Sequence, residues 1–338
     1  MKFVIWLWEL LTAALNAAAT DEESGEYMKK DVLVTGGAGF IGSNLVRLLL
    51  SRGYAVRVLD NLTTGYQENL EGLQGVEFVK GDIMDAPLLQ KMVQGTSVVF
   101  HMAAAVGNVR SLEDPHFDAN INVMGTLNVL EAARKTNVRK IVFSSSAAIF
   151  GEPVEMPITE DHPVNPDSPY GVSKLAAEKY CLCYNRLYGM ENVCLRYFNV
   201  YGQHQRYDAY GNVIPIFLTK LRRGEALTVY GDGEQTRDFV YVGDVVEATV
   251  LALGCEKAAG EILNVGTGKA TSVNQLSRIF TKLMHCSSVK PKYVARREGE
   301  IRHSQADITK AKKILGYRPR VSLGQGLKRF VEWKSGAK

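Results

Sequence analysis

A phenol and an ammonium group stand four residues apart in the sequence, at Tyr170 and Lys174. Four residues make about one helical turn, so on a helix both side chains would lie on the same face. A free tyrosine has a pKa of about 10, and a nearby cation lowers it by stabilising the phenolate, which favours base catalysis at neutral pH. Ser146 closes a run of three serines and could hydrogen-bond the same substrate hydroxyl. Taken alone, the tyrosine–lysine spacing is more often that of a solvated surface pair.

A glycine-rich turn upstream favours the catalytic interpretation of that pair. The turn lies between an apolar run at 31–35 and an amphipathic stretch that ends at Gly53. Glycines in such a turn let the backbone approach a pyrophosphate closely, and the start of the following helix presents its N–H groups to the phosphates. The residues that we assign to this dinucleotide site are Gly36, Gly39, Phe40, Ile41 and Gly42.

Two carboxylates follow the next two apolar runs. Asp60 ends the run at 55–60, where a carboxylate accepts hydrogen bonds from both ribose hydroxyls and repels a 2′-phosphate. This residue therefore favours NAD over NADP as the cofactor. Asp82 follows the run at 76–80 and could hold the adenine amino group. The competing interpretation is structural, with Asp60 as a turn residue and Asp82 as an ordinary cap.

The elements that must position these residues follow from the pattern of apolar residues. From Asp31 onward, short apolar runs alternate with stretches of helical periodicity, which predicts a parallel sheet with crossover helices. The expected strands are 31–35, 55–60, 76–80, 98–101, 139–144 and 192–198, and helices are expected through 126–134 and from Tyr170 onward. We therefore predict the α/β class, with a doubly wound parallel sheet of the Rossmann type.

The expected domain boundaries follow from a change in this pattern after Tyr201, where prolines and glycines separate shorter elements. We predict an NAD-binding Rossmann domain at 28–200, with 240–253 returning to it. The remaining segments, 201–239 and 254–338, are predicted to form a smaller C-terminal substrate-binding lobe. Since ligands of open α/β sheets bind beyond the carboxyl ends of the strands, this lobe would close over a substrate.

Composition argues against several classes of function for the 338-residue chain. Its formal charge of +4 is small and dispersed, so we expect no nucleic-acid partner. Its five cysteines have neither disulfide nor zinc spacing, which is typical of a reducing compartment, and we predict a cytoplasmic location. Its six histidines form no ligand motif, so we predict no metal.

The first 27 residues differ from the rest of the chain. Their apolar stretch is interrupted by Glu9 and is too short to predict a membrane span. A single basic residue precedes that stretch, which is untypical of a signal peptide. We expect residues 1–27 to be a dispensable extension and predict no membrane partner; a membrane anchor is the alternative.

Seven motifs occur in order along the chain. They are TGGAGFIGS at 35–43, LDNL at 59–62, GDI at 81–83, SSS at 144–146, YGVSK at 170–174, RYFNVYG at 196–202 and GDGEQTRD at 231–238. With these motifs the chain resembles the extended short-chain dehydrogenase/reductase family, and within it the nucleotide-sugar epimerases and dehydratases. The resemblance covers nearly everything from Met28 to the C-terminus.

The resemblance implies roles for the matching positions in catalysis and cofactor binding. Ser146, Tyr170 and Lys174 match the family's catalytic triad, and Lys174 also matches the residue that holds the nicotinamide ribose. Asn61, Ile83 and Asn122 match further positions of the cofactor site, with Asn122 as the structural asparagine. The implied cofactor is NAD.

The resemblance also implies a UDP-sugar as the substrate. Asn199, Arg237 and Arg297 match ligands of its diphosphate, and an arginine can present two parallel donors to a phosphate. Glu300 matches a position near the nucleotide ribose. Ser304 aligns with a position where a tyrosine restricts sugar size in some members, so a small residue there leaves room for a 2-acetamido group. UDP-N-acetylglucosamine is therefore an alternative substrate, unless Ser304 merely lies in a loop.

Ala147 and Ala148 follow Ser146, at a position where related dehydratases and decarboxylases carry an acidic residue. Methyl groups cannot exchange protons, so the implied reaction is reversible oxidation at C4, with Tyr170 as the base and NAD as the hydride acceptor. We therefore expect a UDP-hexose 4-epimerase of the UDP-glucose/UDP-galactose type. The alternatives are another NAD-dependent nucleotide-sugar reductase or dehydratase, and a non-catalytic NAD-binding scaffold, against which the intact triad argues.

The same resemblance implies an oligomeric state. The helices expected around 122–134 and 170–188 match those that pair across the dimer interface in this family. Tyr180, Tyr184 and Leu187 give an apolar stripe that suits either burial or dimerisation. A homodimer is therefore expected.

Overall fold

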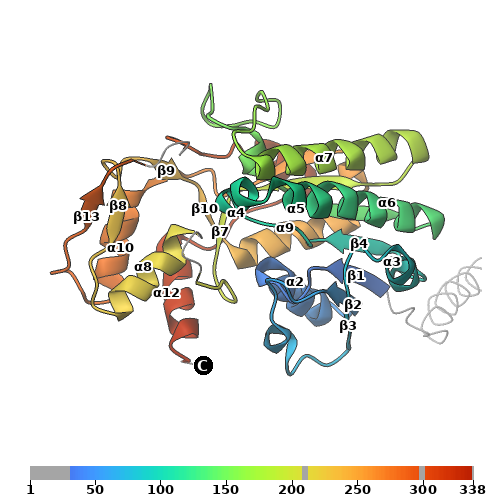
Figure 1. Ribbon diagram of the computed structural model, residues 1–338, viewed down its shortest axis with the longest axis horizontal. Helices are drawn as coiled ribbons and strands as arrows, with labels where there is room; N and C mark the ends of the chain where they lie inside the picture. Colours follow the sequence, from blue (N-terminus) through green and yellow to red (C-terminus); the bar gives the residue numbers. More distant parts are fainter. Residues whose placement is uncertain (1–30, 208–211, 297–300, 337–338) are drawn as a thin grey trace, which may run out of the picture. The chain divides into compact units, whose positions relative to one another are not determined.

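Seven parallel strands form the central sheet, in the order β11-β6-β5-β4-β1-β2-β3 (Figure 1). Their bounds are β1 Asp31–Thr35, β2 Ala55–Asp60, β3 Val76–Lys80, β4 Val98–His101, β5 Lys140–Ser146, β6 Val193–Tyr197 and β11 Ile262–Val265. The computed structural model describes residues 31–207, 212–296 and 301–336, so the expectation for residues 1–27 lies outside the described residues. The α/β class and the doubly wound parallel sheet are confirmed.

The sheet has one strand more than the sequence predicted. All six expected strands are present, but β11 adds a seventh at the edge, where Ile262–Val265 pairs in parallel with Cys194–Tyr197. This strand comes from a range that the sequence analysis had placed in the second lobe. Its run of four residues is too short to distinguish a strand from a buried helical segment.

The strand order reverses at β1, which lies between β2 and β4. Thr35, the last residue of β1, is level with Leu59 of β2 and with His101 of β4. After β1 the chain continues to β2 on one side of β1, and after β4 it continues to β5 on the other side. Crevices for ligands open at such a switch point in α/β sheets.

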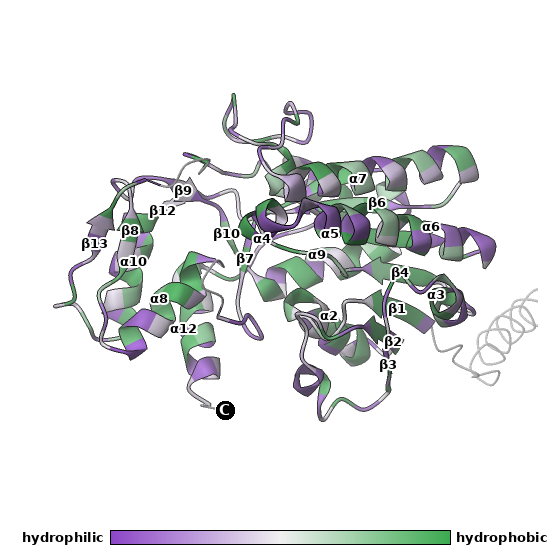
Figure 2. Ribbon diagram, viewed as in Figure 1, coloured by the Kyte–Doolittle hydropathy of each residue, from purple (hydrophilic) through white to green (hydrophobic). Residues whose placement is uncertain are grey.

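Helices cover both faces of the sheet and divide its core into two clusters. One face carries α2 (Phe40–Ser51) and α9 (Val242–Gly254), and the other carries α3 (Ala86–Val93), α6 (Gly125–Lys135) and α7 (Pro169–Tyr188) (Figure 1). Successive side chains of a strand point to opposite faces, so Val32 and Val34 join the first cluster and Leu33 the second. Because both faces are covered, the central strands are hydrophobic over most of their length (Figure 2).

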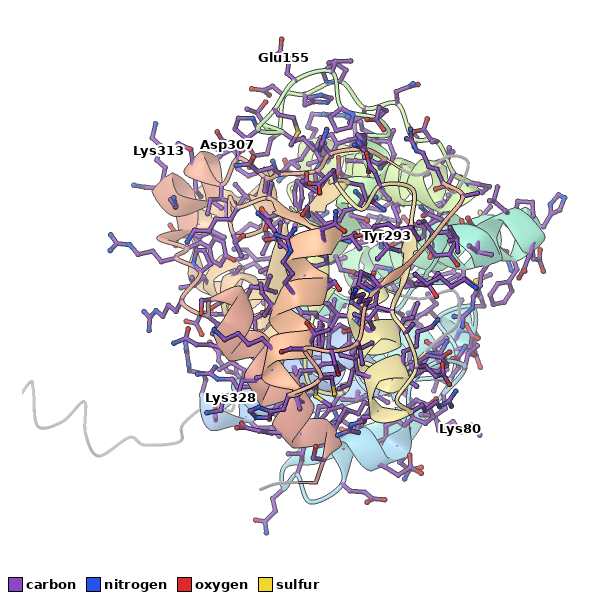
Figure 3. All side chains as sticks on the ribbon, turned by 90° about the vertical axis from the view of Figure 1, so that its left-hand side faces the viewer. Lys80, Glu155, Tyr293, Asp307, Lys313 and Lys328 are labelled. Atoms are coloured by element: carbon purple, nitrogen blue, oxygen red, sulfur yellow. The ribbon has the colours of Figure 1, made fainter. Side chains whose placement is uncertain are left out.

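The smaller elements beyond the sheet form short strand pairs and packed helices. The strands are β7 Asn199–Tyr201 with β10 Phe239–Tyr241, β8 Thr228–Tyr230 with β13 Lys292–Val294, and β9 Thr236–Arg237 with β12 Thr271–Ser272. The helices are α8 Val213–Arg222, α10 Val273–Leu283, α11 Thr309–Leu315 and α12 Leu323–Lys334. Phe217 of α8 meets Phe280 of α10 edge to face, whereas Lys313 of α11 and Lys328 of α12 extend outward (Figure 3).

Short helices fill the connections between the strands and the longer helices; all but η4, which precedes β11, follow the carboxyl end of a strand. They are η1 Gln67–Leu70, α4 Asn108–Glu113, α5 Pro115–Ala119, the π-helical turn η2 Asn120–Met124, η3 Ala147–Ile149 and η4 Glu256–Ala258. Within 31–207, 212–296 and 301–336, no helix combines the length and apolarity needed to cross a membrane. Over the same described ranges, no three side chains of the metal-binding types gather as ligands would.

Candidate active site

The backbone packs so closely in the turn between β1 and α2 that Gly36 and Gly42 leave no room for a side chain. Gly36 has a φ of +70°, and a Cβ added to it would lie 2.7 Å from the backbone nitrogen of Ala103. A Cβ added to Gly42 would collide with the carbonyl oxygen of Gly36. No side chain caps the start of α2, whose N-cap residue is Gly39. The N–H groups at this helix start fit the pyrophosphate of a dinucleotide, because helix N-termini attract anions.

Asp60 is fixed at the carboxyl end of β2, beside this turn. Its side chain is buried, and its two oxygens accept hydrogen bonds from the backbone N–H groups of Ala38 (2.9 Å) and Leu62 (2.8 Å). Burial raises the pKa of Asp60, and these hydrogen bonds oppose that shift. Asp60 therefore shapes the turn, and it also stands where the ribose hydroxyls of NAD would need an acceptor.

The ends of β2 and β3 are joined by a side-chain hydrogen bond. Asn61 Nδ2 donates to Asp82 Oδ2 (2.7 Å), while Asp82 Oδ1 accepts from the N–H of Met84 (2.9 Å). The structure therefore brings Asn61 and Asp82 together next to Asp60. The side chain of Ile83 instead points into the core cluster under α3, α6 and α7.

The catalytic candidates on α7 are positioned by the way this helix begins. Ser168 is the N-cap residue, and its hydroxyl accepts a hydrogen bond from the N–H of Gly171 (3.2 Å). Pro169 takes the first helical position, where its missing N–H costs nothing. Tyr170 and Lys174 consequently fall in the first two turns, directly beyond the carboxyl end of β5.

The structure brings Ser146, Tyr170 and Lys174 together. Ser146 ends β5, and its hydroxyl is close enough to Tyr170 to lower the pKa of that phenol. The Lys174 side chain is buried, and its ammonium lies 4.3 Å from the centre of the Phe143 ring. A solvated surface pair is therefore excluded.

Burial determines the protonation of this pair. It raises the pKa of Tyr170 to about 12 and lowers the pKa of Lys174 to about 8. The pKa of Tyr170 is thus raised, whereas the sequence predicted that it would be lowered by the neighbouring cation. The loss of water around the phenol disfavours the phenolate and decides the direction. The neighbouring Ser146 hydroxyl lowers the pKa of Tyr170, but it offsets only part of the shift. Base catalysis by Tyr170 therefore needs a further positive charge beside it.

Asn122 lies in the π-helical turn η2 and joins the segment after β4 to α7. Its Oδ1 accepts from the N–H of Ala105 (2.9 Å), and its Nδ2 donates to the carbonyl oxygen of the same residue (3.0 Å). The same Nδ2 also lies 3.0 Å from Ser173 Oγ, one residue before Lys174. Such π-helical turns are frequent at functional sites.

The sequence analysis missed two buried acidic groups behind these residues. Glu178 and Arg196 form a pair at 2.8 Å with both side chains buried, and Glu178 also accepts from Ser145 Oγ (2.7 Å). The second group is Asp118 on α5, which is likewise buried. A signal existed for Glu178, which lies four residues after Lys174 and hence on the same helical face. Asp118 becomes a neighbour of Lys174 only through the packing of α5 against α7.

The candidate substrate residues lie on the short strand pairs. Asn199 begins β7, and its N–H donates to the carbonyl oxygen of Asp238 (3.0 Å), which follows Arg237. The structure therefore brings Asn199 and Arg237 close to each other. Arg297 and Glu300 lie outside the described residues.

Ser304 is buried in a segment that is hydrogen-bonded on both sides. The carbonyl oxygen of Arg302 accepts from the N–H of Thr236 (3.0 Å), and that of Gln305 accepts from the N–H of Ile158 (2.8 Å). These bonds hold the segment between β9 and the loop that follows β5. Ser304 is therefore fixed in place and does not lie in a free loop.

A family model described as the NAD dependent epimerase/dehydratase family matches residues 32–266. A putative UDP-glucose 4-epimerase of Methanocaldococcus jannaschii is 47% identical over 306 residues, which cover 89% of this chain and 97% of the relative. The match therefore extends over nearly the whole length of both proteins.

Two solved structures are also similar to the chain. A UDP-glucose 4-epimerase of Thermotoga maritima, solved with UDP-glucose, has a TM-score of 0.86 and 40% identity, over 90% of this chain and 99% of that one. A UDP-N-acetylglucosamine 4-epimerase of Methanobrevibacter ruminantium, in complex with UDP-N-acetylmuramic acid, has a TM-score of 0.87 and 35% identity, over 92% and 99%. Similar folds thus serve different UDP-sugars.

Proposed function

Since the chain belongs to the NAD dependent epimerase/dehydratase family, we propose that it is a UDP-hexose 4-epimerase that interconverts UDP-glucose and UDP-galactose. The observation that carries the proposal is the short helix η3, where Ala147 and Ala148 follow Ser146. Further acid/base chemistry on a 4-keto sugar needs a proton-exchanging side chain at this place, and methyl groups offer none. The reaction that remains is the removal of a hydride from C4 of the sugar and its return to the same carbon.

The residues of the site divide the work of this reaction. Bound NAD supplies the acceptor of the C4 hydride and, in its oxidised form, a positive charge. Tyr170 takes the proton of the C4 hydroxyl, while the neighbouring Ser146 orients that hydroxyl. The ammonium of Lys174 favours the phenolate and holds the nicotinamide ribose.

The remaining contacts of the proposed complex involve both nucleotides. The turn residues Gly36, Gly39 and Gly42 hold the pyrophosphate of NAD, and Asp60 holds its ribose. Asn199, Arg237 and Arg297 bind the diphosphate of the substrate, with Glu300 near the nucleotide ribose. Helices α8, α10 and α12 and the strand pairs β8–β13 and β9–β12 close over this sugar nucleotide, whereas β11, which the sequence analysis had placed in this lobe, belongs to the central sheet.

The direct test uses purified protein with UDP-glucose and UDP-N-acetylglucosamine in separate reactions, with NMR to follow the C4 epimers. We expect UDP-galactose to form from UDP-glucose. A dehydratase would instead yield a keto sugar that has lost water, an oxidoreductase would change the oxidation state of the sugar together with that of NAD, and a scaffold would bind NAD and leave both sugars unchanged. With NAD bound, no interconversion of either sugar rejects the epimerase proposal.

Ser304 supports a second candidate substrate, UDP-N-acetylglucosamine, because a small residue leaves room for the 2-acetamido group. Ser304→Tyr is expected to lower kcat/KM for UDP-N-acetylglucosamine by about tenfold or more, as a clash of about 1–3 kcal/mol would. We expect UDP-glucose to be affected much less, since its 2-hydroxyl is small. Both values are measured by coupled assay, with Ser304→Ala as the control. Equal losses for both sugars would mean that position 304 does not select sugar size.

We also propose a homodimer, built on the outer face of α5, η2 and α7. Phe117, Met124, Val172 and Leu187 are exposed there, and a hollow of about 400 Å³ lies between α5 and the start of α7. An apolar surface of this kind is typical of an interface. We expect light scattering to give the mass of a dimer, and Val172→Asp to give a monomer. A monomeric wild-type chain would reject this interface.

We propose the cytoplasm as the location of the enzyme. All five cysteines are free in the structure, which suits a reducing compartment. Residues 1–27 are proposed to be dispensable for activity. Cell fractionation of the full chain and of a chain lacking 1–27 tests both statements, because membrane retention that depends on 1–27 contradicts them.

A further inference from the structure

A buried carboxylate, Asp118, lies on α5 behind the catalytic helix α7. We propose that Asp118 is a positioning residue: its negative charge holds Lys174 in the ammonium form, and its hydrogen bonds fix the turn of α7 that carries Lys174. This inference deepens the proposed function and rests on it, since it concerns the base chemistry of Tyr170 and Lys174.

Both oxygens of Asp118 accept hydrogen bonds from uncharged side chains. Oδ1 accepts from Ser173 Oγ (2.5 Å), and Oδ2 accepts from Asn122 Nδ2 (3.1 Å). Asn122 Nδ2 also lies 3.0 Å from Ser173 Oγ, so the three side chains close a ring. Burial raises the pKa of Asp118, and these two hydrogen bonds and the charge of Lys174 oppose that shift, which favours the ionised form. The ring ties α5 and η2 to α7 one residue before Lys174.

Other ionisable groups face Lys174 from the elements packed around it. They are Cys181 and Glu178 on α7, Cys194 on β6 and His101 on β4. The charge of Glu178 is matched by Arg196. Burial raises the pKa of Cys194 and lowers the pKa of His101 to about 3, so both are neutral at pH 7. Asp118, unlike Glu178, has uncharged hydrogen-bond donors, Ser173 and Asn122. Its negative charge is therefore not matched by an arginine and acts on Lys174.

The charge of Asp118 affects the two catalytic groups in the same direction. Burial lowers the pKa of Lys174 to about 8 and Asp118 opposes that shift, so removing the carboxylate lowers the pKa of Lys174 further. Asp118 also raises the pKa of Tyr170, alongside burial and against Ser146. Removing the carboxylate therefore lowers both pKa values. Both limbs of a pH–activity profile then move to lower pH, whereas a merely structural role leaves the limbs in place.

Asp118→Asn tests this inference, because it keeps the size of the side chain and an acceptor for Ser173 but removes the charge. Lys174 is titrated by NMR of ¹³C-labelled lysine in the full chain as purified, and its signal is assigned by its absence in Lys174→Arg. We expect its midpoint, about 8 in the wild type, to fall by about one pH unit. At pH 8 the ammonium fraction of Lys174 would fall from about one half to about one tenth.

Ser173→Ala is the matched control, since it removes a hydrogen bond of Asp118 and leaves the carboxylate. We expect its Lys174 midpoint to stay close to the wild-type value. Asp118→Ser, which is smaller and uncharged, is titrated in parallel, and circular dichroism verifies that each variant is folded. An unchanged Lys174 midpoint in a folded Asp118 variant overturns the inference. The titration needs no substrate, so it tests the role of Asp118 even if no epimerisation is seen. Failure of this inference is therefore distinguishable from failure of the proposed function.

Discussion

Replacing Tyr170 by phenylalanine is expected to lower the rate of C4 epimerisation by about 10³-fold. The substitution removes only the oxygen that takes the proton of the C4 hydroxyl. The ring is half-buried, and phenylalanine fills the same space, so we expect the variant to fold and to keep NAD. Turnover is measured by NMR of UDP-glucose, and bound NAD is measured after denaturing the purified protein.

Tyr180→Phe is the matched control, because Tyr180 lies on the same helix with its ring exposed. We expect that variant to turn over at the wild-type rate. Retained activity in Tyr170→Phe would show that another group is the base. A loss of bound NAD in Tyr170→Phe would mean that the hydroxyl serves cofactor binding as well as proton transfer.

Replacing Gly42 by alanine is expected to weaken NAD binding by about 10–100-fold. The added methyl group would collide with the carbonyl oxygen of Gly36 and approach the Cα of Gly37 to 2.8 Å. Backbone atoms cannot rotate away as a side chain does, so the turn itself must open. Overpacking of this kind costs about 1–3 kcal/mol, which corresponds to the stated loss of affinity.

Gly324→Ala controls for the general effect of adding a methyl group to a helical glycine. Gly324 lies in α12, where an added Cβ meets no atom within 4 Å. NAD affinity is measured by calorimetry on protein freed of cofactor, and melting temperature is recorded for both variants. Unchanged affinity in Gly42→Ala would remove this turn from the NAD site.

Local patterns in the sequence were sufficient for the frame of the fold. The strands β1, β4, β5 and β6 were predicted because parallel strands covered on both faces are rich in apolar residues. Strand β2 and the edge strand β3 have shorter, interrupted apolar runs. The turn after β1 was predicted because a close approach of backbone to backbone requires glycine, as at Gly36 and Gly42. The spacing of Tyr170 and Lys174 likewise placed both on one helix. Each of these features depends on residues within about 15 positions of one another.

Features that join distant segments were decided only by the tertiary structure. Strand β11 enters the sheet after an excursion of more than 60 residues from β6, and nothing in its four residues specifies that partner. Asp118 meets Ser173 across 55 positions because α5 packs on α7. Ser304 is fixed between Thr236 of β9 and Ile158 of the loop that follows η3.

The catalytic pair, Tyr170 and Lys174, depends both on local spacing in the sequence and on tertiary packing. The sequence by itself determined that Tyr170 and Lys174 share a helical face, because helix geometry depends only on spacing. Their pKa values depend on how much water the rest of the chain removes, and burial raised that of Tyr170 instead of lowering it. Desolvation comes from every segment that packs around a site, so only the tertiary structure could decide it.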